Sequence, residues 1–405
     1  MRATRYLVAA VILSVGLSTA LSVTSASAEE GERARYRPSA GVTFNGPGDF
    51  AINDKVLRAT RHSHRGSKIR AMTWNFNSWV FVRALREAHQ RGVSVRVIMA
   101  RSLAHEQGWG GPYRTLKRAL KKQHRRPEMR SWFRTCANSC RGRGGAMHTK
   151  MYLFSKTGAQ PKVVMSSSAN LTGAAGANQY NDMYTVRGAK KAYAGSIKVF
   201  NQAGRDRPAK PVVYQAGKVR GWFQPRPGRA DIVMNMLNRV RCRGARGAGI
   251  NGRTSIRIAQ DVILGERGIR IAKRLRELNQ QGCNIRLVYS QLGGNVWKLL
   301  RWIPRNHLVQ DRDGDGAYDV YLHMKAMAIS GRYGGNRGAR VVYQGSENWS
   351  GLARVSDEQG LIIQRDSVER AYGKRINRLF HIHLPSARLL PRAQRAPNPY
   401  VNMER

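Results

Sequence analysis

The sequence predicts an α/β protein built from two similar lobes. The main observation is a duplication, because short segments of the first half recur in the same order in the second half. Each half shows a strand, an amphipathic helix, a glycine turn and a second strand, a pattern typical of helices that flank a sheet. The repeat is too long for a solenoid unit, so it indicates two lobes.

The elements of the two halves match in chain order. After a variable insert, each half continues with a third strand, a fourth strand that ends in an asparagine turn, and a terminal helix. We therefore predict a first lobe over residues 42–218 and a second over 219–390, with an extension at 29–41 and a tail at 391–405. The matching segments are 67–71 and 254–258 for the first strand, 80–90 and 268–280 for the helix, 91–97 and 281–287 for the turn and second strand, and 151–154 and 326–329 for the third strand.

The third strand of each half follows a histidine and a lysine two residues apart. Of the ten histidines, only His148 and His323 have a lysine two positions later, at Lys150 and Lys325. Side chains two apart point to the same face of a strand, so each imidazole would lie beside an ammonium group. A single motif of this kind is also what a core histidine beside a surface lysine would give, but two ordered copies favour a site.

Each motif is followed downstream by a turn of small residues that holds an asparagine. The first turn contains Ser168 and Asn170, and the second contains Ser346 and Asn348. Two imidazoles, two ammonium groups and two carboxamides at one place would suit a phosphodiester. Histidine can attack phosphorus or protonate an oxygen, while lysine and asparagine hold the charged oxygens.

These motifs resemble those of the phospholipase D superfamily, whose signature is His-x-Lys-x4-Asp followed by Gly-Ser-x-Asn, twice per active site. The resemblance covers about residues 42 to 385. It implies two lobes related by a pseudo-twofold axis and one active site shared between them. It also implies a covalent phosphohistidine, no cofactor for the chemical step, and a monomer. We expect His148 to be the nucleophile and His323 the general acid, although near symmetry would also allow the reverse.

Two acidic residues match positions where the family keeps a carboxylate bonded to the catalytic imidazole. They are Asp182 and Glu358. A carboxylate there would fix the tautomer and favour the cationic imidazole; alternatively, both are solvated loop acids. The chain departs from the signature at its aspartate, which is Ser155 in the first copy and Ser330 in the second. In the family that aspartate is chiefly structural, so the chemistry is still expected.

The composition constrains the partners. The chain has 71 lysines and arginines against 24 acidic residues, a formal net charge of +47. Such a charge concentrates polyanions, so we expect peripheral contact with anionic surfaces, either nucleic acid or lipid headgroups. An arginine-rich composition with no targeted partner would give the same charge.

The N-terminus predicts secretion. Arg2 and Arg5 precede an apolar run that ends near Leu21, and Ala26-Ser27-Ala28 forms a small-x-small cleavage site. We therefore interpret residues 1–28 as a signal peptide and expect the mature protein to be extracellular. An uncleaved anchor is the alternative, but the run is near the lower length limit for spanning a bilayer.

Four cysteines suit that oxidising compartment. We expect two disulfides, Cys136 with Cys140 and Cys242 with Cys283, rather than a zinc cluster, because the spacing does not fit a zinc finger. Asp311, Asp313 and Asp315 have the spacing of a calcium loop, but the twelfth position is Leu322 instead of glutamate. They predict either a structural calcium ion or an ordinary aspartate-glycine turn.

We expect a hydrolase, and its substrate is the main open choice. The leading hypothesis is a phospholipase D that degrades phosphatidylcholine to phosphatidate and the free headgroup, because several inserts carry aromatic residues suited to a lipid interface. An extracellular endonuclease that needs no metal is the alternative, favoured by basic residues interleaved with aromatics. A non-catalytic polyanion-binding protein is a third class. The aromatic residues, which could also be core, are Trp109, Tyr113, Trp222, Phe223, Trp297 and Trp302.

Overall fold

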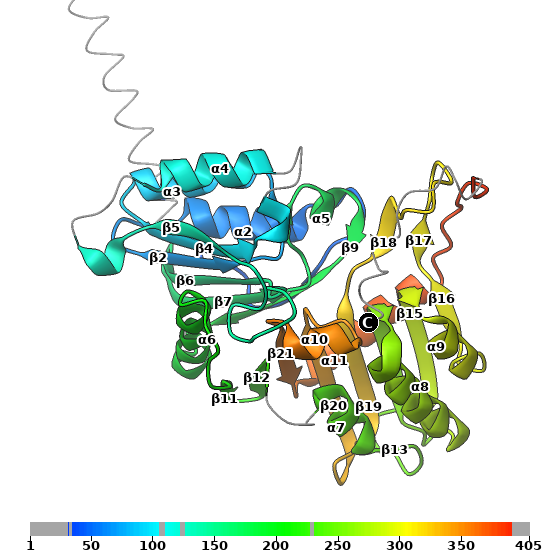
Figure 1. Ribbon diagram of the computed structural model, residues 1–405. Coiled ribbons are helices and arrows are strands. Elements are labelled where there is room, and N and C mark those ends of the chain that lie inside the picture. Colours follow the sequence, from blue (N-terminus) through cyan, green and yellow to red (C-terminus); the bar gives the residue numbers. More distant parts are fainter. Residues whose placement is uncertain (1–30, 32–34, 105–109, 122–125, 227–230, 391–405) are drawn as a thin grey trace, which may run out of the picture.

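The computed structural model describes residue 31 and residues 35–104, 110–121, 126–226 and 231–390. In these residues the chain forms two α/β lobes, each built on one large mixed sheet (Figure 1). The predicted fold class is confirmed. The predicted signal peptide and C-terminal tail lie outside the described residues, as does Trp109.

The sheet of the first lobe has seven strands. From edge to edge the order is β1 (Gly41–Phe44), β10 (Asp182–Arg187), β7 (Gln160–Ser167), β6 (Met151–Thr157), β2 (Lys68–Met72), β4 (Ser94–Ala100) and β5 (Trp132–Cys136). Strands β2, β4 and β5 are parallel, and the other neighbours are antiparallel. The helix α3 (Trp79–Gln90) connects β2 to β4, as the strand-helix-strand pattern predicts.

The sheet of the second lobe repeats this order. It runs β11 (Val213–Ala216), β12 (Val219–Phe223), β21 (Gln359–Ile363), β20 (Asn336–Gly345), β19 (Lys325–Tyr333), β14 (Ser255–Ile263), β15 (Asn284–Leu292) and β16 (Arg305–His307), and β13 (Val240–Arg241) pairs with β19. The parallel strands are β14, β15 and β16, and α8 (Gly265–Gln280) connects β14 to β15. Apart from β11 and β13, each strand has a counterpart in the first lobe.

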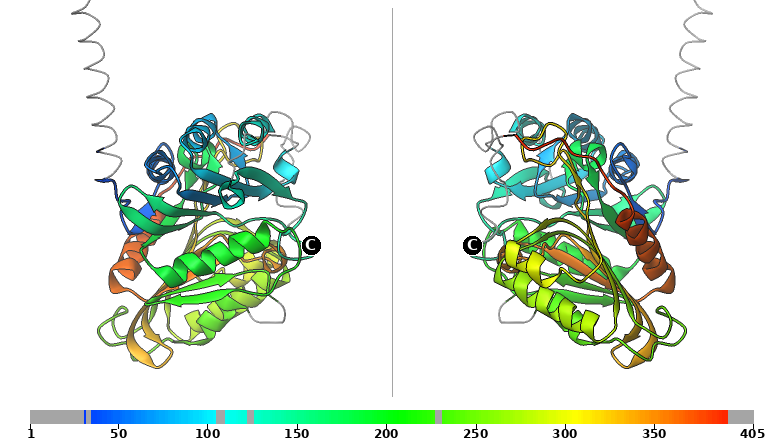
Figure 2. Two further views of the ribbon diagram at one scale, coloured as in Figure 1. Left: turned by 90° about the vertical axis from the view of Figure 1, so that its left-hand side faces the viewer. Right: turned by 90° about the vertical axis from the view of Figure 1, so that its right-hand side faces the viewer.

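The lobes are layered around three hydrophobic clusters, and Figure 2 shows the layers edge-on. In the first lobe α2 (Ala51–Arg61), α3 and α4 (Gly110–Ala119) cover the outer face of the sheet. In the second lobe α7 (Ile232–Asn238), α8 and α9 (Gly294–Leu299) do the same. The inner faces share one cluster with α6 (Lys190–Ala203) and α11 (Asp366–Phe380). The shared cluster holds the two lobes together.

Alternation along the strands explains this arrangement. In β6, Leu153 belongs to the shared inner cluster, whereas its neighbours Tyr152 and Phe154 belong to the outer cluster of the first lobe. In β19, Ala326 and Ala328 face inward and Met327 faces outward. Because the central strands are buried on both faces, their sequences are almost continuously apolar. The alternation of faces therefore does not appear as an alternation of polar and apolar residues.

Short strands also cross between the lobes. β9 (Gln179–Tyr180) pairs with β18 (Val320–Leu322), which in turn pairs with β17 (Val309–Gln310). Met147 forms a parallel bridge with Asp357. Each of these two crossings leads into one of the two histidine motifs.

Within the first lobe β3 (Phe76–Asn77) pairs with β8 (Leu171–Thr172) beside the short helix α5 (Ala174–Ala177). In the second lobe α10 (Gly351–Val355) takes the place of α5.

The predicted division at 218 and 219 falls inside a hairpin. β11 and β12 pair with each other, and β12 pairs with β21 of the second sheet. The hairpin therefore belongs to the second lobe, and the first lobe ends after α6. None of the helices in the described residues is long and apolar enough to cross a membrane.

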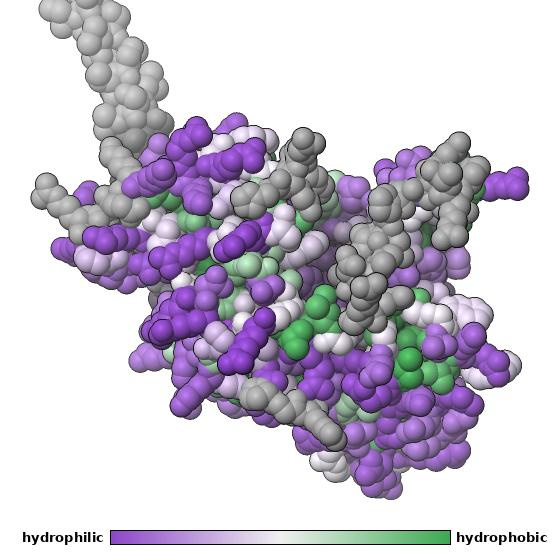
Figure 3. All heavy atoms as spheres, viewed as in Figure 1, coloured by the Kyte–Doolittle hydropathy of each residue, from purple (hydrophilic) through white to green (hydrophobic). Residues whose placement is uncertain are grey.

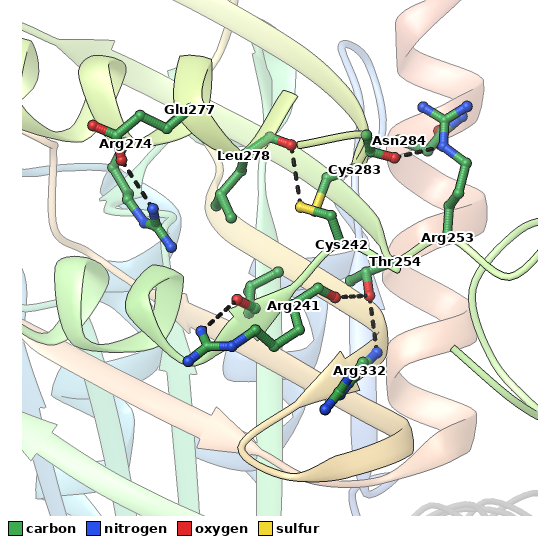
Figure 4. The surroundings of a disulfide bond; sticks show 12 residues. Arg241, Cys242, Arg253, Thr254, Arg274, Glu277, Leu278, Cys283, Asn284 and Arg332 are labelled. Atoms are coloured by element: carbon green, nitrogen blue, oxygen red, sulfur yellow. Dashed lines mark hydrogen bonds and ion pairs between the residues drawn. A yellow bond between two sulfur atoms is a disulfide. The ribbon is translucent and has the colours of Figure 1, made fainter. Parts of the chain in front are cut away.

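Both predicted disulfides are confirmed. Cys136 pairs with Cys140 at the end of β5, and Cys242 pairs with Cys283 in the second lobe. Figure 4 shows the second bridge, where the carbonyl oxygen of Leu278 in α8 lies 3.1 Å from the Cys242 sulfur. The second bridge fastens the segment before β14 to the turn between α8 and β15.

Candidate active site

The two histidine motifs lie at the start of equivalent strands. β6 begins at Met151 and β19 at Lys325. Each histidine therefore lies just before its strand, whereas the sequence had predicted it within the strand. The backbone N–H of His148 donates to the Asp357 carbonyl, and that of His323 to the Tyr180 carbonyl. Each histidine is therefore anchored to the opposite lobe.

The two lysines are fully buried, and each forms the same hydrogen bond with its histidine. Lys150 Nζ donates to the backbone carbonyl of His148 at 2.6 Å, and Lys325 Nζ to that of His323 at 2.7 Å. Both side chains are 0% exposed. Burial lowers the pKa of both lysines. Buried ammonium groups need anionic partners, and a phosphodiester would supply one.

The first histidine is bonded to a carboxylate of the second lobe. His148 Nδ1 lies 2.8 Å from Glu358 Oε1, and the other carboxylate oxygen accepts a hydrogen bond from Ser346. Glu358 is 3% exposed, so it is not a solvated loop acid. The predicted supporting roles of Glu358 and Ser346 agree with this geometry.

The second histidine is bonded to an amide, so the predicted role of Asp182 is wrong. His323 Nδ1 lies 2.8 Å from Asn181 Oδ1, which also accepts a hydrogen bond from Ser168 at 2.9 Å. The buried carboxylate of Asp182 instead accepts a hydrogen bond from Tyr372 of α11 at 2.6 Å. Burial raises the pKa of Asp182 to about 6. Asn181 is thus the counterpart of Glu358.

The two asparagines of the small-residue turns lie at equivalent strand ends. Asn170 Oδ1 accepts hydrogen bonds from Thr73 and from the Asn75 backbone, both at 3.3 Å. The backbone carbonyl of Asn348 accepts one from Arg267 at 3.2 Å, and its side-chain oxygen has no partner within the described residues. Both asparagines are about 95% buried, at 6% and 5% exposure. Their carboxamides are available to hold phosphoryl oxygens.

Gln359 and Gln344 were not predicted, although both join the lobes at the site. The Gln359 amide accepts from the Lys150 backbone N–H at 2.9 Å and donates to the carbonyls of Lys150 and Ser167. Gln344 is hydrogen-bonded to Ser166 through both the side chain and the backbone of that serine. A buried glutamine with no alternation or motif around it gives no sequence signal.

Two further residues that sequence reasoning missed lie beside the motifs. The Trp74 ring lies 5.7 Å from the His148 ring, and Lys150 Nζ lies 5.9 Å from the centre of Trp74. On the other side Asp261 Oδ2 lies 2.9 Å from Lys325 Nζ and 3.9 Å from His323 Nε2. Trp74 and Asp261 each come four residues after an equivalent arginine, Arg70 or Arg257.

The buried charges of both motifs act on each histidine. Burial lowers the pKa of His148 well below its ordinary value, and Lys150 and Lys325 lower it further. Burial likewise lowers the pKa of His323, and Lys325, Lys150 and His148 add to the effect. Burial raises the pKa of Glu358 to about 8. A bound phosphodiester anion would favour the cationic form of each histidine.

The serines that replace the signature aspartate have structural contacts. Ser155 accepts a hydrogen bond from the Lys68 backbone N–H at 2.8 Å. Ser330 accepts one from the Gly249 backbone and another from Arg340, both at 3.1 Å. Neither serine belongs to the catalytic cluster, so the substitutions leave that cluster intact.

The aspartate loop forms hydrogen-bonded turns. Asp311 accepts from the backbone N–H groups of Gly314 and Gly316, at 2.6 and 2.9 Å. Carboxylate oxygens of Asp311, Asp313 and Asp315 lie within 4.8 Å of one another, a spacing that suits a hard cation. Asp313 and Asp315 also accept backbone N–H groups, as an aspartate-glycine turn requires. The structural calcium ion stays a prediction.

Comparison with known proteins agrees with the geometry. Residues 58–202 match the family described as "Cardiolipin synthase, PLD-like domain". Phosphatidylserine synthase from Haemophilus influenzae is similar in structure, with a TM-score of 0.59 and 12% identity over 85% of this chain and 86% of that chain. Residues 58–202 therefore match a domain of the phospholipase D superfamily, and the structural likeness shows that the chain shares the fold. The catalysis that this superfamily carries out requires no metal cofactor.

Two other superfamily structures differ in how much of them is matched. Polyphosphate kinase from Porphyromonas gingivalis has a TM-score of 0.51 and 12% identity over 84% of this chain. This chain spans only 50% of that kinase. Nuc from Salmonella typhimurium is 16% identical, with a TM-score of 0.33 over 41% of this chain and 94% of Nuc. No curated protein sequence matches the chain. At these identities the likeness establishes the fold and leaves the substrate to be argued from the site.

Proposed function

We propose that the protein is a secreted phospholipase D that hydrolyses the distal phosphodiester bond of glycerophospholipids. The observation that carries the proposal is the pair of imidazoles, one per lobe, each with its Nδ1 hydrogen-bonded to a side chain of the opposite lobe. Such bonds leave both Nε2 atoms for the phosphorus chemistry. Lys150, Lys325, Asn170 and Asn348 would hold the phosphoryl oxygens.

The reaction proceeds in two steps. His148 Nε2 attacks phosphorus, a P–N bond forms and the P–O bond to the headgroup breaks, while His323 gives its proton to the departing oxygen. Water then takes the place of the headgroup and gives a proton to His323 as its oxygen attacks phosphorus. The P–N bond breaks, and phosphatidate and the starting enzyme result.

Exposed tryptophans support a lipid interface. Trp79, Trp297 and Trp302 are 59%, 49% and 70% exposed. Tryptophan favours the boundary between water and lipid. The expectation was wrong for Tyr113, Trp222 and Phe223, which are core residues exposed by 5%, 5% and 1%.

An endonuclease is the second candidate, supported by the charge. Hydrophilic residues cover most of the face shown in Figure 3, and the whole chain carries a formal charge of +47. Such a protein would attract a nucleic-acid backbone. Interleaved basic and aromatic groups occur at Trp297 with Arg305 and at Trp302 with Arg301, with ring distances of 4.9 and 5.1 Å. Bases can stack on such pairs.

An assay without added metal separates the two candidates. We expect the mature protein to release choline from phosphatidylcholine vesicles, and His148→Ala to release none, while the exposed His383→Ala stays active as a matched control. DNA cleavage by the wild type without choline release would replace the lipase proposal with the nuclease. The binding of His148→Ala to vesicles and to DNA, measured from about 50 to 500 mM salt, adds a second criterion. For duplex DNA, the logarithm of the binding constant should fall with the logarithm of the salt concentration, with a slope of about 0.9 per phosphate contact.

We also propose a monomer, since one chain supplies both half-sites. Mixing His148→Ala with His323→Ala should restore no activity, because each variant lacks one member of its own site. Sedimentation of the wild type should give the mass of one mature chain. Restored turnover in the mixture would instead indicate exchange of lobes between chains.

A further inference from the structure

One side of the active site holds a carboxylate that the two-step reaction does not use. Asp261 lies in β14, and its counterpart in the first lobe is Trp74. Oδ2 of Asp261 is bonded to Lys325 at 2.9 Å. The other oxygen, Oδ1, is buried and has no hydrogen-bond partner among the described residues. An unpartnered carboxylate oxygen in a residue 4% exposed is costly, so a ligand that donates to it would be favoured.

The position of Asp261 relates it to the leaving group. Its Oδ2 lies 3.9 Å from His323 Nε2, the atom that protonates the departing oxygen in the proposed reaction. The leaving group of the first step and the attacking water of the second must both contact this nitrogen. In the proposed reaction Asp261 therefore lies near the side of phosphorus from which the headgroup leaves.

Aromatic rings complete this side. The Tyr321 ring meets the His323 ring edge-on, with centres 5.8 Å apart. Asp261 is close enough to both Tyr318 and Tyr321 that its charge helps to raise the pKa of each phenol, although burial is the larger cause. A carboxylate with tyrosine rings suits a small cationic or hydroxylated group. It repels a further phosphate, as in a polynucleotide leaving group.

We propose that Asp261 binds the leaving group and the incoming acceptor through an ammonium or hydroxyl donor. This inference rests on the proposed phosphodiesterase function and deepens it. Asp261 selects small alcohols that carry a second donor, such as a protonated amino alcohol or a diol. In the second step such an alcohol gives its hydroxyl proton to His323, its oxygen bonds to phosphorus, and the P–N bond to His148 breaks.

Acceptor competition tests the role of Asp261. Bis(4-nitrophenyl) phosphate loads the enzyme and releases one nitrophenolate, and the phosphoenzyme then partitions between water and an added alcohol. We expect the wild type to prefer ethanolamine and ethylene glycol over 1-propanol by roughly 10-fold at equal concentration, the effect of one charge-assisted hydrogen bond. The product ratio, measured by mass spectrometry, does not depend on the amount of active enzyme.

The variants distinguish the donor. Asp261→Asn should lose the preference for ethanolamine and keep part of that for ethylene glycol, while Asp261→Ala should lose both. Asp366→Asn, exposed by 66% on α11, is the matched control and should keep the wild-type ratios. If the wild type prefers ethanolamine alone, Asp261 binds ammonium groups. If it prefers both ethanolamine and ethylene glycol, Asp261 binds hydroxyl groups as well.

Two results would overturn the inference while leaving the proposed function intact. The first is a wild type that releases nitrophenolate but shows no acceptor preference. The second is a preference that Asp261→Ala retains at a reduced rate, as expected if Asp261 only pairs with Lys325. Failure of the wild type to release nitrophenolate above the His148→Ala level would count against the phosphodiesterase itself.

Discussion

The two half-sites share their backbone plan but differ in the groups that surround each imidazole. His148 has a carboxylate at Nδ1 and an indole beside it, whereas His323 has an amide at Nδ1 and a carboxylate near Nε2. A carboxylate at Nδ1 stabilises the positive charge of a phosphohistidine, and an amide contributes no such charge. The difference therefore favours His148 as the nucleophile and His323 as the proton carrier, which the motifs alone left open.

The largest effect should come from removing either histidine. His148→Ala and His323→Ala should each lower turnover on phospholipid by about 10³-fold or more, because the two act as one unit. Nitrophenolate needs little protonation, so His323→Ala should still give a burst of one nitrophenolate per enzyme from bis(4-nitrophenyl) phosphate. Mass spectrometry should find the phosphoryl group on His148. A burst in His148→Ala with none in His323→Ala would reverse the assignment.

The next effect concerns the carboxylate of the first half-site. The nucleophile requires a free Nε2, and therefore an ionised Glu358 that accepts the Nδ1 proton. Burial raises the pKa of Glu358 to about 8, so the rate of the nitrophenolate burst from bis(4-nitrophenyl) phosphate, which does not need the His323 proton, should rise as the pH increases through that value. Glu358→Gln should lower turnover by about 10²-fold and remove this rising limb. A pH profile that keeps the limb in Glu358→Gln would assign it to another group.

Much of this architecture could be predicted from the sequence because the duplication is expressed in local patterns. Paired motifs and the strand-helix-strand order fixed both the fold class and the six catalytic candidates. The helix α3 begins one residue earlier than predicted, and α8 begins three residues earlier. Terminal residues of helices depend on tertiary contacts, which periodicity does not record.

The mistaken role of Asp182 has a specific cause. The stretch from Asn170 to Asn181 is one residue longer than that from Asn348 to Glu358, so aligning acid with acid shifts the register by one. In a strand such a shift moves a side chain to the other face. Trp74 and Asp261 could have been found by extending the match of Arg70 with Arg257 along the strand, but the residue types differ.

The disulfides extend the comparison of the half-sites to stability. The bridge Cys242–Cys283 spans 41 residues and Cys136–Cys140 spans four. Replacing each pair by serine should lower the free energy of unfolding by about 4 and about 2 kcal/mol, respectively, measured in urea. The backbone N–H of Cys140 donates to Asp357, the neighbour of Glu358. Only the shorter bridge should therefore also affect kcat, and an equal effect of both on kcat would contradict this.

The smallest effect should come from making the half-sites alike. Asn181→Asp places a carboxylate at Nδ1 of His323, which favours the cationic imidazole and raises the pKa of His323. The general acid must be protonated in the first step, so a higher pKa increases the protonated fraction of His323 and should raise kcat/KM on phospholipid several-fold at neutral pH, while the nitrophenolate burst, which does not need this proton, stays unchanged. Asn181→Gln, which keeps an amide, is the control and should leave both rates unchanged. If Asn181→Asp changed the nitrophenolate burst instead, His323 would be the group that attacks phosphorus, and the roles drawn from the asymmetry would be exchanged.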